Sequence, residues 1–172
     1  MKRLHFINTA MIATALSLLT ACTISYKFNG TVIDYSKVKS IAITDFNNRA
    51  PMVYAPLAVT FNEKIKDTYT KQTRLELVDR NGDLELEGEI TGYDITPQSM
   101  TSNALSAETR LTIRIQVRYT NNTNHDEDFE RSYSAYRNFD SSKLITDVQD
   151  ELIDEIVEEI CDNIYNDTVA NW

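Results

Sequence analysis

The spacing of apolar positions changes along this chain, and each spacing predicts a type of element. Residues 38–46 alternate well enough for a strand, which 47–51 should interrupt. Pro56 suits the first turn of a helix. Apolar side chains then recur at every fourth residue and form one stripe on a helix of about four turns. They are Leu57, Phe61, Ile65 and Tyr69.

The middle of the chain carries the two longest predicted strands, which follow a short strand over 74–78 and a turn at Asn81-Gly82. Apolar and polar residues alternate over 84–93 and again over 105–119, so each strand should have one apolar and one charged face. The alternation assigns Gly92 to the apolar face and Tyr93 to the charged face.

A loop over 97–104 allows these two strands to pair as an antiparallel hairpin. One register satisfies both charge and hydrophobicity. It sets Ile90 opposite Ile113, Glu89 opposite Arg114, Glu85 opposite Arg118 and Leu86 opposite Val117. We interpret the charged face as a solvated ladder in preference to a binding surface, because exposed ion pairs contribute only about 0 to 1 kcal/mol each.

A further strand over 128–137 should add to the edge, with Phe129, Tyr133 and Ala135 on one side; Arg131 interrupts this pattern. The last predicted element is a long amphipathic helix, with Ser141 and Ser142 as candidate caps. Its apolar stripe contains Leu144, Ile145, Val148, Leu152, Ile153, Ile156, Val157, Ile160 and Ile164.

The opposite face of this helix is acidic. It carries Asp147, Asp150, Glu151, Asp154, Glu155, Glu158, Glu159, Asp162 and Asp167, and no Lys or Arg follows Lys143. Acids near a helix C-terminus are unfavourable for the helix itself. We interpret the run as a solvated face, with a docking surface for a basic partner as the alternative.

The order of elements predicts an α+β two-layer sandwich. We expect a mixed, mostly antiparallel sheet of four to five strands with two helices on one face.

The N-terminus resembles a lipoprotein signal sequence. A basic start and a charge-free apolar run end at Leu19-Thr20-Ala21-Cys22, which resembles the lipobox of bacterial lipoproteins. A signal anchor would need about twenty strongly apolar residues; an ordinary secretory peptide with a chance cysteine is the other alternative. We expect a signal peptide over 1–21, a lipidated tether over 22–37 and one domain over 38–172.

Charge narrows the possible partners. The chain has 172 residues and a net charge of −9, which becomes −11 once the signal segment with Lys2 and Arg3 is removed. We do not expect nucleic acid as a partner, because its binding needs clustered basic residues. An anionic membrane surface also attracts basic clusters, so the lipid on Cys22 should provide the membrane anchor.

The sequence contains no recognisable catalytic motif, and we predict neither enzyme activity nor a cofactor or metal. If Cys22 carries lipid, Cys161 has no disulfide partner, and its apolar helical position predicts a buried, inert thiol. His125 lies in a polar turn beside Asp126 and Glu127 and is expected to be solvated.

The order of motifs resembles the LptE-like lipopolysaccharide-assembly lipoproteins. The resemblance follows the lipobox, the strand ending Ile43-Thr44-Asp45-Phe46, the segment Gly82-Asp83-Leu84 with Leu86, Gly88 and Ile90, the strand from Ala107 to Ile113, and the long helix from Leu144. It implies the periplasmic side of the outer membrane as the location and an LptD-type β-barrel as the partner, in which the protein acts as a plug and helps export lipopolysaccharide.

The resemblance also directs attention to the hairpin tip, where enterobacterial relatives carry basic residues linked to lipopolysaccharide binding. Residues 97–104 contain no basic residue here, and charge-assisted bonds to phosphate need Arg or Lys. The candidate contacts with a partner or with lipopolysaccharide are Arg49, Met100, Arg110, Arg114 and Arg118. The alternative function is a tethered periplasmic adaptor for cell-wall synthesis or secretion machinery.

Overall fold

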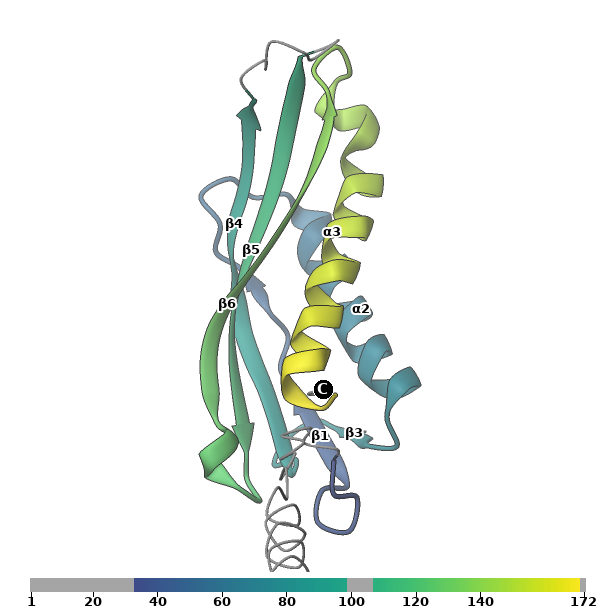
Figure 1. Ribbon diagram of the computed structural model, residues 1–172, viewed down its shortest axis with the longest axis vertical. Helices are drawn as coiled ribbons and strands as arrows, with labels where there is room; N and C mark the ends of the chain where they lie inside the picture. The colour runs from purple at the N-terminus through teal and green to yellow at the C-terminus, as the bar shows by residue number, and fades with distance from the viewer. Residues whose placement is uncertain (1–32, 99–106, 171–172) are drawn as a thin grey trace, which may run out of the picture.

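Two helices pack against one face of a mixed six-stranded sheet in the computed structural model, which describes residues 33–98 and 107–170 (Figure 1). The elements are β1 (Ser40–Ile43), β2 (Asn47–Asn48), α2 (Ala55–Gln72), β3 (Glu76–Val78), β4 (Leu84–Pro97), β5 (Glu108–Asn121), the 3-10 helix η2 (His125–Glu127), β6 (Phe129–Asp140) and α3 (Ile145–Thr168). The predicted α+β sandwich is confirmed, with a sheet slightly larger than expected.

The strands follow the order β3-β1-β4-β5-β6 across the sheet. β1 lies parallel to β3 and β4, whereas β4, β5 and β6 are antiparallel. Asn47 and Asn48, which were expected to lie in a break, instead pair with Glu89 and Ile90 as the short parallel strand β2. The chain thus pairs with β4 twice, first through β1 and again through β2, with a short gap over residues 44–46 between them.

The side chain of Asn62 on α2 binds the backbone of Phe46, which lies in the gap between β1 and β2. Its Oδ1 accepts the N–H of Phe46 at 2.8 Å, and its Nδ2 donates to the Phe46 carbonyl at 3.1 Å. The amide therefore satisfies a backbone position that has no neighbouring strand. Phe46 can then bury its ring against Phe61, with the ring centroids 4.9 Å apart.

Helix α2 matches its prediction, and Pro56 lies in its first turn. The four predicted stripe residues are at most 1% exposed. They form the contact of α2 with the sheet and α3, so the period of the sequence alone identified this face of the helix.

Helix α3 begins differently from the prediction. Its N-cap residue is Leu144, and no side chain caps this end; Ser142 instead donates its N–H to Asp140 Oδ1 in the preceding turn. Leu144 is 68% exposed, and full burial of the stripe begins only at Ile153. Figure 1 shows the reason: the first turns of α3 extend beyond the start of α2 toward the end of the β4–β5 hairpin.

The predicted hairpin register is wrong by two residues. Ile90 lies opposite Ile115, and Leu86 lies opposite Tyr119. Because the shift is an even number, both strands keep the predicted faces in this part of the sheet. Charge and hydrophobicity could not discriminate between these two registers, because each puts Arg118 opposite a glutamate.

A β-bulge between Ile90 and Gly92 reverses the alternation in the rest of β4. Tyr93 therefore lies opposite Ile113 on the apolar face and is only 3% exposed, whereas Gly92 lies opposite Arg114 on the charged face. Both assignments made from the sequence are corrected. The expected ion pairs are likewise replaced by Arg118–Glu87 at 2.9 Å and Arg114–Asp94 at 2.6 Å.

Strand β6 has the predicted facing residues, with Tyr133 and Ala135 buried against the helices and Phe129 half-buried. Within residues 33–98 and 107–170, no helix is long and apolar enough to cross a membrane.

Candidate functional site

The sheet face away from the helices is open, and β5 lines it with arginines. Arg110, Arg114 and Arg118 are spaced by four residues, so the two-residue period of a strand places all three side chains on one face. The alternate residues Leu111, Ile113, Ile115 and Val117 point toward the helices and are fully buried. The three candidate contacts on β5 are thus brought into one row.

Two of these arginines are neutralised by neighbouring strands. Arg118 contacts Glu87 of β4 at 2.9 Å and Glu130 of β6 at 3.4 Å, and its pKa is raised by the charge of Glu130 first and by the bond to Glu87 second. Arg114 pairs with Asp94, and its side chain lies over Gly92, where a Cβ would come within 2.8 Å of Nε. Both pairs are well exposed, so their contribution to stability is small.

Arg110 differs from the other two because it makes no ion pair within the described residues. Its Nε donates to Asn138 Oδ1 at 3.0 Å, and its guanidinium carbon lies 3.9 Å from the ring centroid of Tyr136. The two contacts orient the guanidinium without neutralising it. Of the three arginines on β5, Arg110 is closest along the strand to the hairpin end and is the best placed to bind an anionic group.

The remaining candidates lie elsewhere. Arg49 follows β2, so it is separated from β5 by β4; its backbone N–H donates to Ile90 O at 2.8 Å, and its side chain is exposed. Met100 lies outside the described residues. The five candidate residues therefore do not form one compact site.

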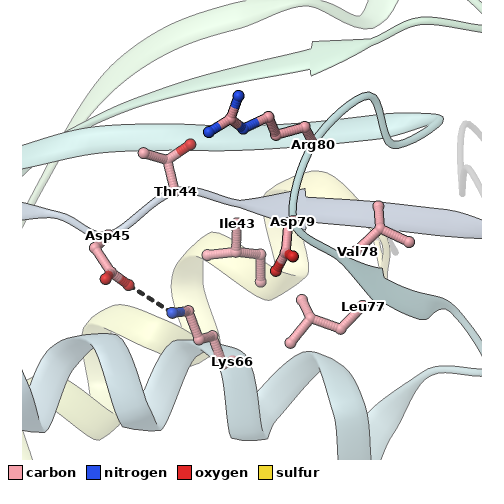
Figure 2. A pocket seen from close by; sticks show the side chains of 8 residues that line it. All are labelled: Ile43, Thr44, Asp45, Lys66, Leu77, Val78, Asp79 and Arg80. Atoms are coloured by element: carbon pink, nitrogen blue, oxygen red, sulfur yellow. Dashed lines mark hydrogen bonds and ion pairs between the residues drawn. The ribbon is translucent and has the colours of Figure 1, made fainter.

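Among the grooves that lie beside the short strands, two depend on where β1 and β3 end, so the sequence alone did not reveal them. One, of about 440 Å³, opens on the charged sheet face; its lining includes Glu87, Glu89, Arg118 and Glu130. The other, of about 980 Å³, lies between the end of β1, the end of β3 and α2 (Figure 2). Its lining residues are Ile43, Thr44, Asp45, Lys66, Leu77, Val78, Asp79 and Arg80.

The groove in Figure 2 has a mixed polar and apolar wall. Lys66 of α2 pairs with Asp45, and Arg80 and Asp79 bring a second cation and a second acid from the segment after β3. Leu77 of β3 is 43% exposed and contributes an apolar side chain to the groove wall. Such a lining can bind a polar chain through charges of both signs, and its residues contain no nucleophile paired with a base.

His125 and Cys161 both have local structural explanations. His125 is exposed in η2, and its Nδ1 lies 2.9 Å from Asp128 Oδ2. The pKa of Asp128 is lowered mainly by the backbone N–H of Asn121 and further by His125. Cys161 is 0% exposed, as predicted, and burial raises the pKa of its thiol. Across the described residues, no group of three or more His, Cys, Asp or Glu side chains is arranged to hold a metal ion.

Much of the acidic face of α3 is used inside the domain. Arg137 of β6 contacts Glu155 at 2.7 Å and Glu159 at 2.6 Å, and both bonds raise the pKa of the guanidinium. Lys64 of α2 contacts Glu158 at 2.8 Å. The basic partners of these acids belong to other elements, which is why the sequence of the helix alone could not account for them.

The fold and its surfaces define a class of protein: a two-layer α+β domain with helices on one face of the sheet and charged side chains on the other. The profile of the LptE family, described as lipopolysaccharide-assembly, matches residues 38–168. The chain belongs to the LptE family.

Three solved structures, two of lipoproteins and one of a hypothetical protein, share the fold at low sequence identity. A minor lipoprotein from Acinetobacter baumannii is 13% identical with a TM-score of 0.50, and the match covers 78% of this chain and 94% of that one. Rare lipoprotein B from Shewanella oneidensis is 12% identical with a TM-score of 0.53, and the match covers 74% of this chain and 92% of that one. A hypothetical protein from Chlamydia trachomatis is 12% identical with a TM-score of 0.51, and the match covers 78% of this chain and 99% of that one. No curated protein matches the chain.

Membership of the LptE family supports a role in lipopolysaccharide assembly and transport, and it fits a lipoprotein associated with the outer membrane. LptE proteins are a family of lipoproteins without a known enzyme activity.

Proposed function

We propose that this protein is a lipoprotein anchored through Cys22 on the periplasmic side of the outer membrane, where it acts as the plug and assembly partner of an LptD-type β-barrel in lipopolysaccharide export. The observation that carries the proposal is the family match over 38–168, which spans nearly the whole described domain.

The arrangement of the domain supports this role. Figure 1 shows the segment leading into β1 at one end of the long axis and the β4–β5 hairpin end at the other. A lipid on Cys22 would hold the first end at the membrane and raise the effective concentration of the domain at a barrel in the same membrane. Three acyl chains at about 0.8 kcal/mol per buried methylene make such an anchor permanent.

Direct binding of lipopolysaccharide is a second part of the proposal, and it rests on Arg110. The guanidinium is oriented by Asn138 and Tyr136 and has no carboxylate partner in the described residues. Arginine binds phosphate through two parallel hydrogen bonds. Arg114 and Arg118 are already paired with carboxylates, so we assign them a supporting role beside Arg110, and Arg49 a separate one on the far side of β4.

The first experiment is site-specific photocrosslinking in cells. A photoreactive residue at Met100, between β4 and β5 in the sequence, should crosslink to a large outer-membrane β-barrel, and one at Glu158, on α3, serves as the comparison. Affinity capture of the lipidated protein should recover the same barrel, and Cys22→Ser should reduce that recovery.

Two results would contradict the proposal. If capture of the native lipoprotein recovered no large barrel, the proposed LptD-type partner would be contradicted. Depletion that leaves surface lipopolysaccharide unchanged but disturbs the cell wall or secretion would instead support the tethered adaptor.

A further inference from the structure

The two edges of the sheet differ greatly in length. On one side the sheet ends in β3, with three residues, and beyond the two-residue β2 in the second half of β4, whereas on the other side it ends in β6, with twelve residues. Proteins protect a long edge with proline, charged side chains, a bulge or a covering element, because its free backbone groups can pair with another chain. β6 contains neither proline nor lysine, and its register with β5 runs without a shift from Phe129 to Asp140. The backbone of this edge is therefore long and regular, and its two helix-facing arginines, Arg131 and Arg137, are both paired with carboxylates of α3.

The pairing of β6 with β5 identifies the backbone groups that face outward. Ser141 donates its N–H to Ala107 O at 3.0 Å, directly beyond the last pair of the ladder. In an antiparallel pair, alternate residues exchange hydrogen bonds with the neighbour, so the odd-numbered residues of β6 bind β5 and the even-numbered ones turn their N–H and C=O outward. The even-numbered residues are Glu130, Ser132, Ser134, Tyr136, Asn138 and Asp140.

Part of this edge has no hydrogen-bond partner within the described residues. The carbonyl of Tyr136 accepts from Arg137 Nη1 at 2.9 Å, and the carbonyl of Asp140 accepts from the N–H of Lys143 at 3.0 Å. The outward backbone groups of Glu130, Ser132 and Ser134 have no such bond. They offer donors and acceptors at the spacing that an extended peptide requires.

An acidic groove lies beside this edge, on the helix side. It has a volume of about 580 Å³ and is lined by Arg137, Glu155, Glu158, Glu159, Asp162 and Asn163. Arg137 belongs to β6, so the groove borders the strand. Three of the four carboxylates in this lining are already paired, Glu155 and Glu159 with Arg137 and Glu158 with Lys64 of α2, whereas Asp162 has no ion pair within the described residues.

We infer that the β6 edge binds an extended, basic segment of a partner protein, which adds a strand beside β6 and places a lysine or arginine in the acidic groove. Backbone hydrogen bonds supply the affinity in such strand addition, and the neighbouring side chains supply the specificity. A second copy of this chain is the wrong occupant, because it has a net charge of −9 and would bring the same four acids to the contact. The inference does not depend on the barrel proposed above.

The test uses the purified full-length protein in detergent and a fluorescent nine-residue peptide that alternates valine and threonine with lysine. The matched control peptide replaces each lysine with glutamate. We expect the basic peptide to bind and the acidic peptide not to bind. Amide hydrogen exchange should show new protection at Ser132 and Ser134 in the complex, whereas Arg131 and Tyr133 are protected with or without peptide because they already bind β5.

Variants separate the backbone and charge contributions. Ser132→Pro removes an outward donor at a position where an edge strand tolerates proline, and it should weaken binding about ten-fold; Ser132→Thr keeps the donor and should bind like the original. Asp162→Asn should weaken binding about two- to five-fold. Asp154→Asn makes the same charge change outside the groove lining and should have no effect.

Several outcomes would overturn the inference. They are equal binding of the acidic peptide, exchange protection confined to other strands, and a dimer that forms through β6 without peptide. The exchange measurement decides the case even if Ser132→Pro fails to fold, because it needs no variant.

Discussion

Arg131 on the helix-facing side of β6 pairs its guanidinium with the carboxylate of Asp167 in the last turn of α3. Asp167 also accepts a hydrogen bond from the Tyr133 hydroxyl at 2.8 Å, and the guanidinium carbon lies 5.1 Å from the ring centroid of Phe129. The charged residue that interrupts the apolar pattern of β6 therefore has a partner in another element. This pair fastens the end of α3 to the sheet.

We expect Arg131→Ala to lower the free energy of unfolding by about 0.5–1 kcal/mol, because about half of the arginine side chain is exposed and solvent screens the pair. Urea denaturation of Arg131→Ala, Asp167→Ala and the double variant measures the coupling energy between the two residues. Arg49→Ala changes an exposed arginine outside any such pair in the described residues and should have almost no effect. A coupling energy of zero would contradict the structural role.

Two glycines of β4 should respond very differently to alanine. A Cβ on Gly88 would come within 2.1 Å of the Gln116 carbonyl oxygen and 2.5 Å of the Phe46 ring, so the backbone of β5 would have to move. The three atoms nearest to a Cβ on Gly92 all belong to the Arg114 side chain, at 2.8 to 3.0 Å, and this exposed side chain can turn away into solvent.

We therefore expect Gly88→Ala to lower the free energy of unfolding by about 3 kcal/mol or more and Gly92→Ala by about 1 kcal/mol or less. Chemical denaturation of the two variants under the same conditions checks the difference. Similar losses would show that close approach of the strands is not the cause.

Cys161 should resist thiol reagents in the folded protein. Its side chain is fully buried, and burial raises the pKa of the thiol, so little thiolate is present at neutral pH. In a Cys22→Ser variant, Cys161 is the one remaining thiol of the chain. In the folded protein, a maleimide should label Cys161 at a rate limited by unfolding. In guanidinium, where the protein is unfolded, labelling should be immediate. Rapid labelling of the folded protein would contradict the buried, inert assignment.

Elements with a strong period were predictable from the sequence, whereas the details that depend on tertiary contacts were not. The stripe of α2 and the faces of β5 follow directly from periods of 3.6 and 2. The bulge in β4 inserts one residue into a regular alternation, and nothing in the pattern of 84–93 marks its place, so Tyr93 was assigned to the wrong face. The short strand β2 was missed because two consecutive asparagines, Asn47 and Asn48, are typical of a break between elements.

The candidate site was predictable only as residue types on a strand. The row Arg110, Arg114 and Arg118 follows from strand periodicity, but its electrostatics do not. Arg114 and Arg118 are neutralised by carboxylates of β4 and β6, and the two-residue shift in register decides which carboxylates these are. The acidic run of α3 was similarly ambiguous, because Arg137 and Lys64 lie on elements distant in the sequence.

The carboxylate of Asp83 fastens the start of β1 to the turn before β4, and this contact should depend on pH. Its Oδ2 accepts the N–H of Lys39 at 2.8 Å and both the N–H and the hydroxyl of Ser40 at 3.0 Å. The backbone N–H of Lys39 is the main cause that lowers the pKa of Asp83 below its ordinary value of 3.8, and the bonds from Ser40 add to it, against an opposing effect of burial.

A carboxyl whose pKa is lower in the folded state adds stability above its unfolded pKa and loses that stability as the pH falls through the folded value. Asp83→Asn, which carries no charge, should therefore lower the free energy of unfolding by about 1 kcal/mol at pH 7. The difference from the original protein should stay constant down to about pH 4 and shrink only below it. Urea denaturation at pH 7, 5, 4 and 3 measures this difference, with the exposed Asp154→Asn as the control. A difference already lost at pH 5 would show that another group, and not Asp83, controls the contact.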